Sequence, residues 1–218
     1  MKNNEELLKD VQAAMKWHPI LNDTRIIVTA DKGIITLKGM VESYSQKKVA
    51  EEATKKVAGV IVVVENIEIQ FNSTNIRTDN EIANEIINAF KWNCDVPDEH
   101  IQIQVENGWV TLDGEVEWNS ERESTNKSVI NLAGVKGITN NITIKSNVHD
   151  EIEKAEIENA LERNSVTHNL DIFVKVTGNR VILDGSVNSR QQKDEAGNIA
   201  WNAPGVGAVD NKLLIEYI

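Results

Sequence analysis

The chain has 218 residues, of which 40% are hydrophobic and 26% are charged, proportions that are ordinary for a soluble globular protein. Its net charge of −11 argues against nucleic-acid binding, which requires clustered Lys and Arg, and against simple electrostatic docking on anionic lipid. The charge is uneven: residues 1–72 hold ten basic and ten acidic residues, residues 73–147 hold six and twelve, and residues 148–218 hold seven and twelve.

The sequence predicts neither export nor a membrane span. Its longest apolar run, Val60–Val64, is far shorter than the roughly 20 residues that a spanning helix needs. Residues 1–6 contain no apolar segment, so no signal peptide is expected. Cys94 is the only cysteine, which excludes an internal disulfide and suits a reducing compartment. We therefore expect a cytoplasmic protein.

The first predicted elements are a helix and a β-hairpin. Apolar residues recur at helical spacing in Leu7, Leu8, Val11, Ala14 and Met15. A stretch that alternates at Ile26, Val28 and Ala30 then leads into a turn at residues 31–33. A second alternating stretch ends at Leu37-Lys38-Gly39. The two stretches form a hairpin, because Asp-Lys-Gly supplies residues that tolerate positive φ.

A second helix and a last strand complete the first unit. The inner face of the helix is formed by Ala50, Ala53, Thr54 and Val57. Gly59-Val60 is expected to end this helix, since glycine is the usual residue just past a helix. The last strand carries Ile67 and Ile69.

The whole pattern occurs three times. Leu-x-Gly recurs at Gly39, Gly114 and Gly185, and Gly-Val recurs 20 residues later in every copy, at Gly59, Gly134 and Gly205. We expect the first three glycines to end a strand where the chain bends, and the other three to cap a helix. A lesser alternative is that carbonyls near the second set contact a monovalent cation.

The predicted fold class is therefore α+β. It consists of three tandem α-β-β-α-β domains at residues 1–72, 78–146 and 149–218, each a small three-stranded mixed sheet with two helices. The third strand lies beside the second as a parallel neighbour or beside the first as an antiparallel one, and the sequence does not decide between them. It also leaves open whether the two helices cover one face of the sheet or both.

This order of elements, with its Leu-x-Gly-x-Val and Gly-Val motifs, resembles the BON domain, named after bacterial osmotically inducible and nodulation proteins. The resemblance rests on these residues in the three copies: Leu37, Gly39, Val41, Gly59, Val60 and Val63; Leu112, Gly114, Val116, Gly134, Val135 and Ile138; and Leu183, Gly185, Val187, Gly205, Val206 and Val209. It implies a transport-associated or osmotic stress role without catalytic residues, with phospholipid contact or potassium binding as possible activities. No metal, cofactor or nucleic acid is expected.

Four side chains are candidate binding or interface residues. Trp17 and Trp92 occupy equivalent positions at the end of the first helix in copies one and two, and both point away from the predicted core. Folding back of each indole onto the following loop is the alternative. Ile130 and Trp201 stand where the first copy has the outward-facing Lys55, so we expect copies two and three to pack on each other or to bind something there.

No constellation for catalysis is repeated in the three copies. The four histidines do not align between copies, and no nucleophile, phosphate-binding or dinucleotide motif occurs. We therefore expect a non-enzymatic, stress-associated binding module that contacts a protein partner, a membrane phospholipid surface or a monovalent ion. The alternative is a structural or oligomerising repeat protein with no small ligand.

Overall fold

A computed structural model describes residues 3–72, 76–145 and 154–216. The expected domain ends at residues 1, 146, 149 and 218 lie outside these ranges. The first repeat contains α1 (Asn4–Lys16), η1 (Pro19–Leu21), β1 (Arg25–Asp31), β2 (Ile34–Val41), α2 (Tyr44–Lys55) and β3 (Val62–Ile69). The second contains α3 (Asp79–Trp92), η2 (Asp98–His100), β4 (Ile101–Glu106), β5 (Trp109–Val116), α4 (Asn119–Ile130), β6 (Gly137–Asn140) and β7 (Thr143–Ile144). The third contains α5 (Lys154–Arg163), β8 (Ile172–Thr177), β9 (Arg180–Val187), α6 (Arg190–Trp201), β10 (Ala208–Asn211) and β11 (Leu214–Ile215).

The sheets have the same mixed topology in all three repeats, which confirms the α+β fold class. β1 pairs with β2 as an antiparallel hairpin, and β3 pairs with β2 in parallel. The same pairings hold for β4, β5 and β6 and for β8, β9 and β10. The central strand is therefore the second one, and the open question of where the third strand lies is decided in favour of the parallel neighbour.

The third strand is continuous only in the first repeat. In the other two it is divided into β6 and β7 and into β10 and β11, so their sheets count four strands. At the break, Oδ1 of Asn140 accepts a hydrogen bond from the backbone N–H of Ile142, at 3.0 Å, and Asn211 does the same for Leu213, at 3.3 Å. These side chains satisfy backbone donors that the parallel ladder leaves unpaired.

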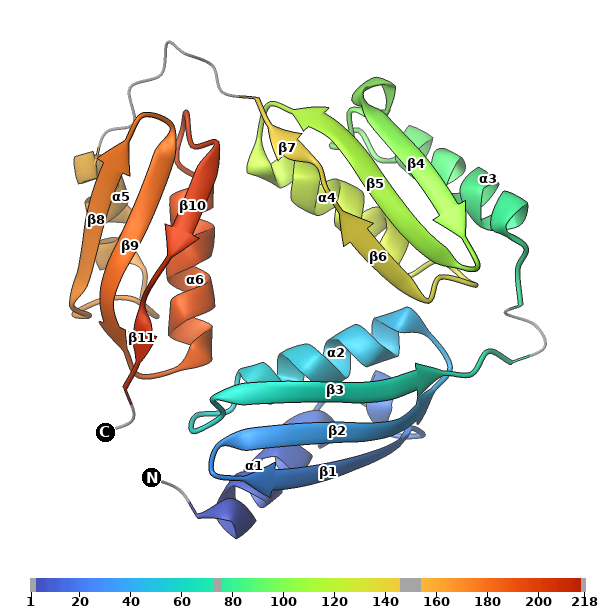
Figure 1. The fold of residues 1–218 in the computed structure, drawn as a ribbon, viewed down its shortest axis with the longest axis horizontal. Helices are drawn as coiled ribbons and strands as arrows, with labels where there is room; N and C mark the ends of the chain where they lie inside the picture. The colour runs from blue at the N-terminus through green and yellow to red at the C-terminus, as the bar shows by residue number, and fades with distance from the viewer. Residues whose placement is uncertain (1–2, 73–75, 146–153, 217–218) are drawn as a thin grey trace.

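Both helices of each repeat pack on one face of its sheet, as Figure 1 shows, with all three sheets in front of their helices. The core lies between these layers. The leucine of each Leu-x-Gly motif is completely buried there, as Leu37, Leu112 and Leu183. The opposite face of each sheet is not covered by any helix of its own repeat.

The glycines of the Leu-x-Gly motifs lie inside the second strand, two residues before its end, rather than at its end as the sequence suggested. Gly39 has φ +147°, and a Cβ atom there would lie 1.9 Å from the carbonyl oxygen of Arg25 on the paired strand. Gly114 and Gly185 approach the paired strand in the same way. The motif therefore requires glycine because two backbones come too close for any side chain.

The second helix ends earlier than its Gly-Val motif suggested. α2 ends at Lys55, with Lys56 as its C-cap, and a turn then leads to Gly59 at φ +101°. Gly134 and Gly205 also have positive φ. These glycines thus close a turn that follows the helix, and the left-handed conformation explains why glycine recurs there.

The three repeats are arranged around a common centre, with the second helices α2, α4 and α6 on the inner side and the first helices farther out (Figure 1). Because the copies do not stack in a line, the C-terminal end of α6 can reach the N-terminal end of α4.

Candidate functional site

Trp17 and Trp92 are the two most exposed large hydrophobic side chains of the described residues, at 85% and 90% of their full surface. Trp17 is the C-cap of α1, and Trp92 is the last residue of α3. Each follows a lysine, Lys16 or Lys91. The indoles stand in solvent, so the first and second repeats each present an aromatic ring next to a cation at the end of their first helix.

The course of the helix explains why these rings point outward. α1 buries Leu7, Val11 and Met15 on one face. Trp17 is two residues beyond Met15, which is about 200° around a helix with 3.6 residues per turn. Pro19 then begins the short helix η1, so the chain turns away directly after the tryptophan. The same spacing of buried residues in α3 directs Trp92 outward.

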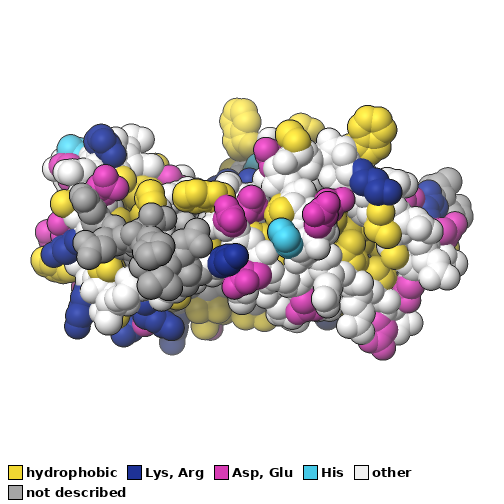
Figure 2. Space-filling model, turned by 90° about the horizontal axis from the view of Figure 1, so that it is seen from above, with side chains coloured by type: hydrophobic (Ala, Val, Ile, Leu, Met, Phe, Trp, Pro, Cys, Tyr) yellow, Lys and Arg dark blue, Asp and Glu magenta, His cyan; other side chains and the backbone are white. Residues whose placement is uncertain are grey.

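Figure 2 shows bulky hydrophobic side chains that stand out along the upper edge of the molecule, while acidic side chains are scattered over the face toward the viewer. A further group of hydrophobic side chains lies along the lower edge, which is the side that the sheets face in Figure 1. Large exposed apolar groups on a soluble protein commonly mark contact sites.

Trp201 lies at an inter-repeat contact. The guanidinium carbon of Arg122 in α4 lies 4.2 Å from the centroid of the Trp201 ring, at the end of α6. Next to it, Nδ2 of Asn119 donates a hydrogen bond to Oδ1 of Asn202, at 3.4 Å. Burial lowers the pKa of the Arg122 guanidinium, although it stays charged at any physiological pH. Repeats two and three therefore touch through a cation–π contact and a polar pair.

Trp118 belongs to the same contact. It stands at the N-cap of α4, where repeats one and three have Ser43 and Ser189, whose hydroxyls each accept a hydrogen bond from a backbone N–H of the first turn. Trp118 lines a small cleft together with Trp201 between the two repeats. The second repeat thus has an aromatic contact where the other two have a hydroxyl cap.

The structure does not bring Ile130 and Trp201 together. Trp201 meets the first turn of α4, whereas Ile130 is the last residue of that helix and half-buried. Eleven residue steps at about 1.5 Å each separate Ile130 from Asn119 by about 16 Å. The partner that the sequence analysis missed is Arg122, which the pattern of outward apolar residues could not indicate.

The equivalent position in the first repeat holds Lys55, which pairs within its own helix. Its Nζ lies 2.5 Å from Oε1 of Glu51, and Nζ of Lys48 lies 3.0 Å from the other oxygen of that carboxylate. Burial acts to raise the pKa of Glu51, but the hydrogen bonds from Lys55 and Lys48 outweigh it and hold the pKa below its ordinary value.

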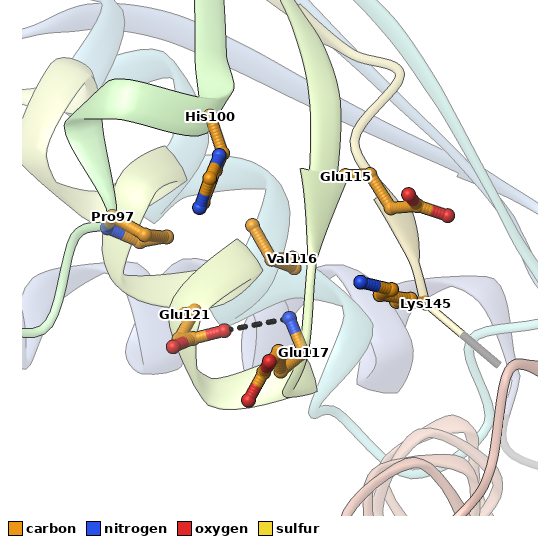
Figure 3. A pocket seen from close by; sticks show the side chains of 7 residues that line it. All are labelled: Pro97, His100, Glu115, Val116, Glu117, Glu121 and Lys145. Atoms are coloured by element: carbon orange, nitrogen blue, oxygen red, sulfur yellow. Dashed lines mark hydrogen bonds between the residues drawn. The ribbon is translucent and has the colours of Figure 1, made fainter. Parts of the chain in front are cut away.

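A cleft of about 330 Å³ in the second repeat contains three acidic side chains (Figure 3). Glu121, one of them, has a structural role, because its Oε2 accepts hydrogen bonds from the backbone N–H groups of Glu117 and Trp118, at 2.9 and 3.0 Å. His100 and Lys145 also line the cleft. Within the described ranges, no group of three or more His, Cys, Asp or Glu side chains is placed to hold a metal ion. One of the acidic side chains in this cleft therefore serves to cap the N-terminus of α4.

Carbonyls around the Gly-Val turn are partly engaged already. The carbonyl of Val57 accepts a hydrogen bond from the N–H of Val60, and the carbonyl of Gly33 accepts from Ile61 and Val62. A monovalent cation would have to compete with these bonds. Potassium binding therefore stays a prediction.

The fold defines a tandem-repeat α+β protein with an exposed tryptophan at the end of the first helix in two of its three repeats. The chain belongs to the BON domain family, which matches residues 3–70, 78–146 and 149–217. The match covers each of the three repeats and indicates no catalytic family.

Among known proteins, the chain is similar to the osmotically-inducible protein Y of Escherichia coli, with 27% identity over 139 residues that make up 62% of this chain and 69% of that protein. Among solved structures, it is similar to CdsD, a structural protein of the type III secretion system of Chlamydia trachomatis. The identity is 18%, the coverage 98% of this chain and 93% of the other, and the TM-score 0.26. A second structure, of the C-terminal domain of CdsD, has 16% identity and the same TM-score, with 99% and 100% covered.

Proposed function

We propose that this chain is a non-enzymatic, stress-associated binding protein that docks on phospholipid membranes through Trp17 and Trp92. The observation that carries the proposal is that both indoles, at equivalent positions in two repeats, are almost fully exposed. Indole rings favour the interface between lipid headgroups and acyl chains, and the preceding lysines can reach phosphate groups. The similarity to an osmotically-inducible protein supports the association with stress.

The net charge of the chain determines how strongly we expect it to bind membranes and which lipids it should prefer. A net charge of −11 opposes anionic membranes, so the insertion of two rings must supply most of the affinity. The neutral first repeat, with Trp17, should make the larger contribution. None of the described helices is both long and apolar enough to cross a bilayer, and binding would therefore be peripheral and reversible. The proposal includes a cytoplasmic location, in which the exposed Cys94 would remain reduced.

The test is flotation of the full chain with vesicles of phosphatidylcholine alone and with added phosphatidylglycerol, at physiological salt. Trp17→Arg and Trp92→Arg introduce the type of residue that the third repeat has at this position, Arg163, and should therefore preserve the fold. Each change should lower partitioning on the order of tenfold, since burial of a large apolar side chain is worth about 1.5–3 kcal/mol. The double change should abolish it.

The matched control is Phe173→Gln, which removes another well-exposed aromatic ring, on the outer sheet face of the third repeat. It should leave flotation unchanged. Flotation that persists in the double tryptophan variant, or the absence of any flotation by the unaltered chain, would refute the membrane role. In the second case a protein partner that takes up the two indoles becomes the better explanation.

A further inference from the structure

The first residue of the second helix contacts the following repeat at both junctions of the chain. Tyr44 begins α2, and its half-buried ring packs against the core of the second repeat. Asn119 begins α4, is buried, and donates a hydrogen bond to Asn202 of the third repeat, at 3.4 Å. The same position of the fold therefore joins each repeat to the next one.

The third repeat uses this position differently. Arg190 begins α6, and its Nε donates to both carboxylate oxygens of Asp194, at 2.9 and 3.2 Å, within the same helix. The three copies thus hold Tyr, Asn and Arg here and share one fold. A tyrosine at position 44 is therefore not required by the fold of the first repeat, and the contact that it makes with the second repeat explains it better.

The arrangement of the repeats directs both exposed tryptophans to one side of the molecule. All three sheets lie in front of their helices in Figure 1. α1 turns Met15 toward its sheet, and Trp17 lies about 200° farther around the helix, so its indole points away from the sheet. Phe90 and Trp92 have the same relation in α3. Both indoles therefore project on the side of the molecule opposite the sheets.

We infer that Tyr44 is a positioning residue for the membrane contact, because it holds repeats one and two together so that Trp17 and Trp92 enter the same bilayer at once. The inference rests on the proposed function and adds how two weak insertions combine. After the first ring has inserted, a second ring that is held in place loses little further freedom. A second repeat that turned freely on its connection would have to be ordered by its own insertion.

The contact is small enough for one substitution to break it. Among the described residues, Tyr44 is the one hydrophobic side chain of the first repeat that packs on the core of the second. Tyr44→Asn introduces the residue that the second repeat has at this position, so it should release the contact and preserve the fold. Tyr44→Phe keeps the ring. Arg190→Asn is the matched control, since the partner of Arg190 lies in its own helix.

The first measurement is a distance between two spin labels on the full chain, by pulsed electron spin resonance. One label is on Cys94, just after α3, and the other on the variant Lys38→Cys in β2; both residues are exposed. With Tyr44 in place the distances should form one narrow distribution, which Tyr44→Asn broadens and Tyr44→Phe preserves. A distribution that is already broad with Tyr44 in place overturns the inference without involving any lipid.

The second measurement is flotation with phosphatidylcholine vesicles, as a cycle of Tyr44→Asn and Trp92→Arg. In the unaltered chain, Tyr44→Asn should remove most of the roughly tenfold gain in partitioning that the second ring supplies. In the Trp92→Arg chain only one ring inserts, so Tyr44→Asn should have no effect there. Arg190→Asn should change neither chain.

The flotation cycle separates a role in positioning from a role in folding. Equal losses from Tyr44→Asn in both chains would show that Tyr44 acts on the fold and not through Trp92, and would overturn the inference. Flotation that Tyr44→Asn leaves unchanged in the unaltered chain would refute the role of Tyr44 alone. Absence of flotation by the unaltered chain would refute the proposed function, and with it the inference.

Discussion

The contact between Arg122 and Trp201 allows a direct energetic test of whether repeats two and three behave as one unit. The guanidinium lies 4.2 Å from the ring centroid, and both side chains are half-buried. A cation–π pair is worth about 0.5–1 kcal/mol when exposed and about 2 kcal/mol when desolvated. For this intermediate burial we expect a coupling free energy of about 1 kcal/mol.

The assay is a double-mutant cycle by urea unfolding, with Arg122→Ala, Trp201→Ala and the double variant. Trp201→Ala alone should cost more than the coupling, because the ring also packs against the core of the third repeat. The double-mutant cycle subtracts this packing contribution and leaves the coupling free energy between Arg122 and Trp201. Hydrogen exchange of α4 and α6 identifies which repeats the unfolding transition involves, since a chain of several domains need not unfold in one step.

Arg122→Lys is the matched variant, because Lys47 and Lys193 occupy the same position in the other two repeats. Those lysines donate hydrogen bonds to the backbone carbonyls of Ile67 in β3 and of Leu213 between β10 and β11. A lysine at position 122 keeps the charge but loses the planar stacking group, so it should lose most of the coupling. A coupling below about 0.2 kcal/mol, or equal values for Arg and Lys, would refute the cation–π explanation.

Three further predictions concern the first repeat. Gly39→Ala should destabilise it by more than about 2 kcal/mol in urea unfolding, because the added Cβ meets the carbonyl of Arg25. Gly178→Ala is the control: its added Cβ has no atom within 4 Å, so the change should cost only about 1 kcal/mol, for the positive φ of that residue. Since the folded-state pKa of Glu51 is lowered, its contribution to stability is complete above the ordinary carboxyl pKa and is lost as pH falls through the lowered value. Glu51→Gln should therefore destabilise the repeat at pH 7, and by less as pH falls through the lowered pKa; a loss of stability that does not change with pH would contradict this. Residues 1–72 alone should give a dispersed amide NMR spectrum, because their core cluster draws on no other repeat.

The element order was predictable because the constraints that set it are local in sequence. Leucine and glycine recur at fixed offsets since each copy buries the same leucine and brings the same two backbones together. The neighbour of the third strand was not predictable. Alternation shows which side chains face the core, but it carries no information on which strand supplies the hydrogen bonds.

The candidate surfaces were predictable only in part. The helical period alone directs Trp17 and Trp92 outward, and this placement needs no knowledge of the rest of the fold. The partner of Trp201 depends on how the repeats are arranged, which is decided by contacts far apart in sequence. The exposed aliphatic side chains on the outer sheet face of the first repeat were missed, although comparing outward strand positions between copies, such as Ile27 with Gln102, would have shown them.

The three copies differ mainly at exposed positions, where the fold does not require a particular residue. Position 17 and its equivalents hold Trp, Trp and Arg, while position 55 and its equivalents hold Lys, Ile and Trp. Unselected change at exposed sites tends toward polar residues, because isolated apolar groups there reduce solubility without stabilising a core. We therefore expect the apolar residues that are confined to particular copies to make separate contacts, so that a single repeat would lack some of them. We expect the membrane contact to need repeats one and two together, and the orientation of the third repeat to depend on α4.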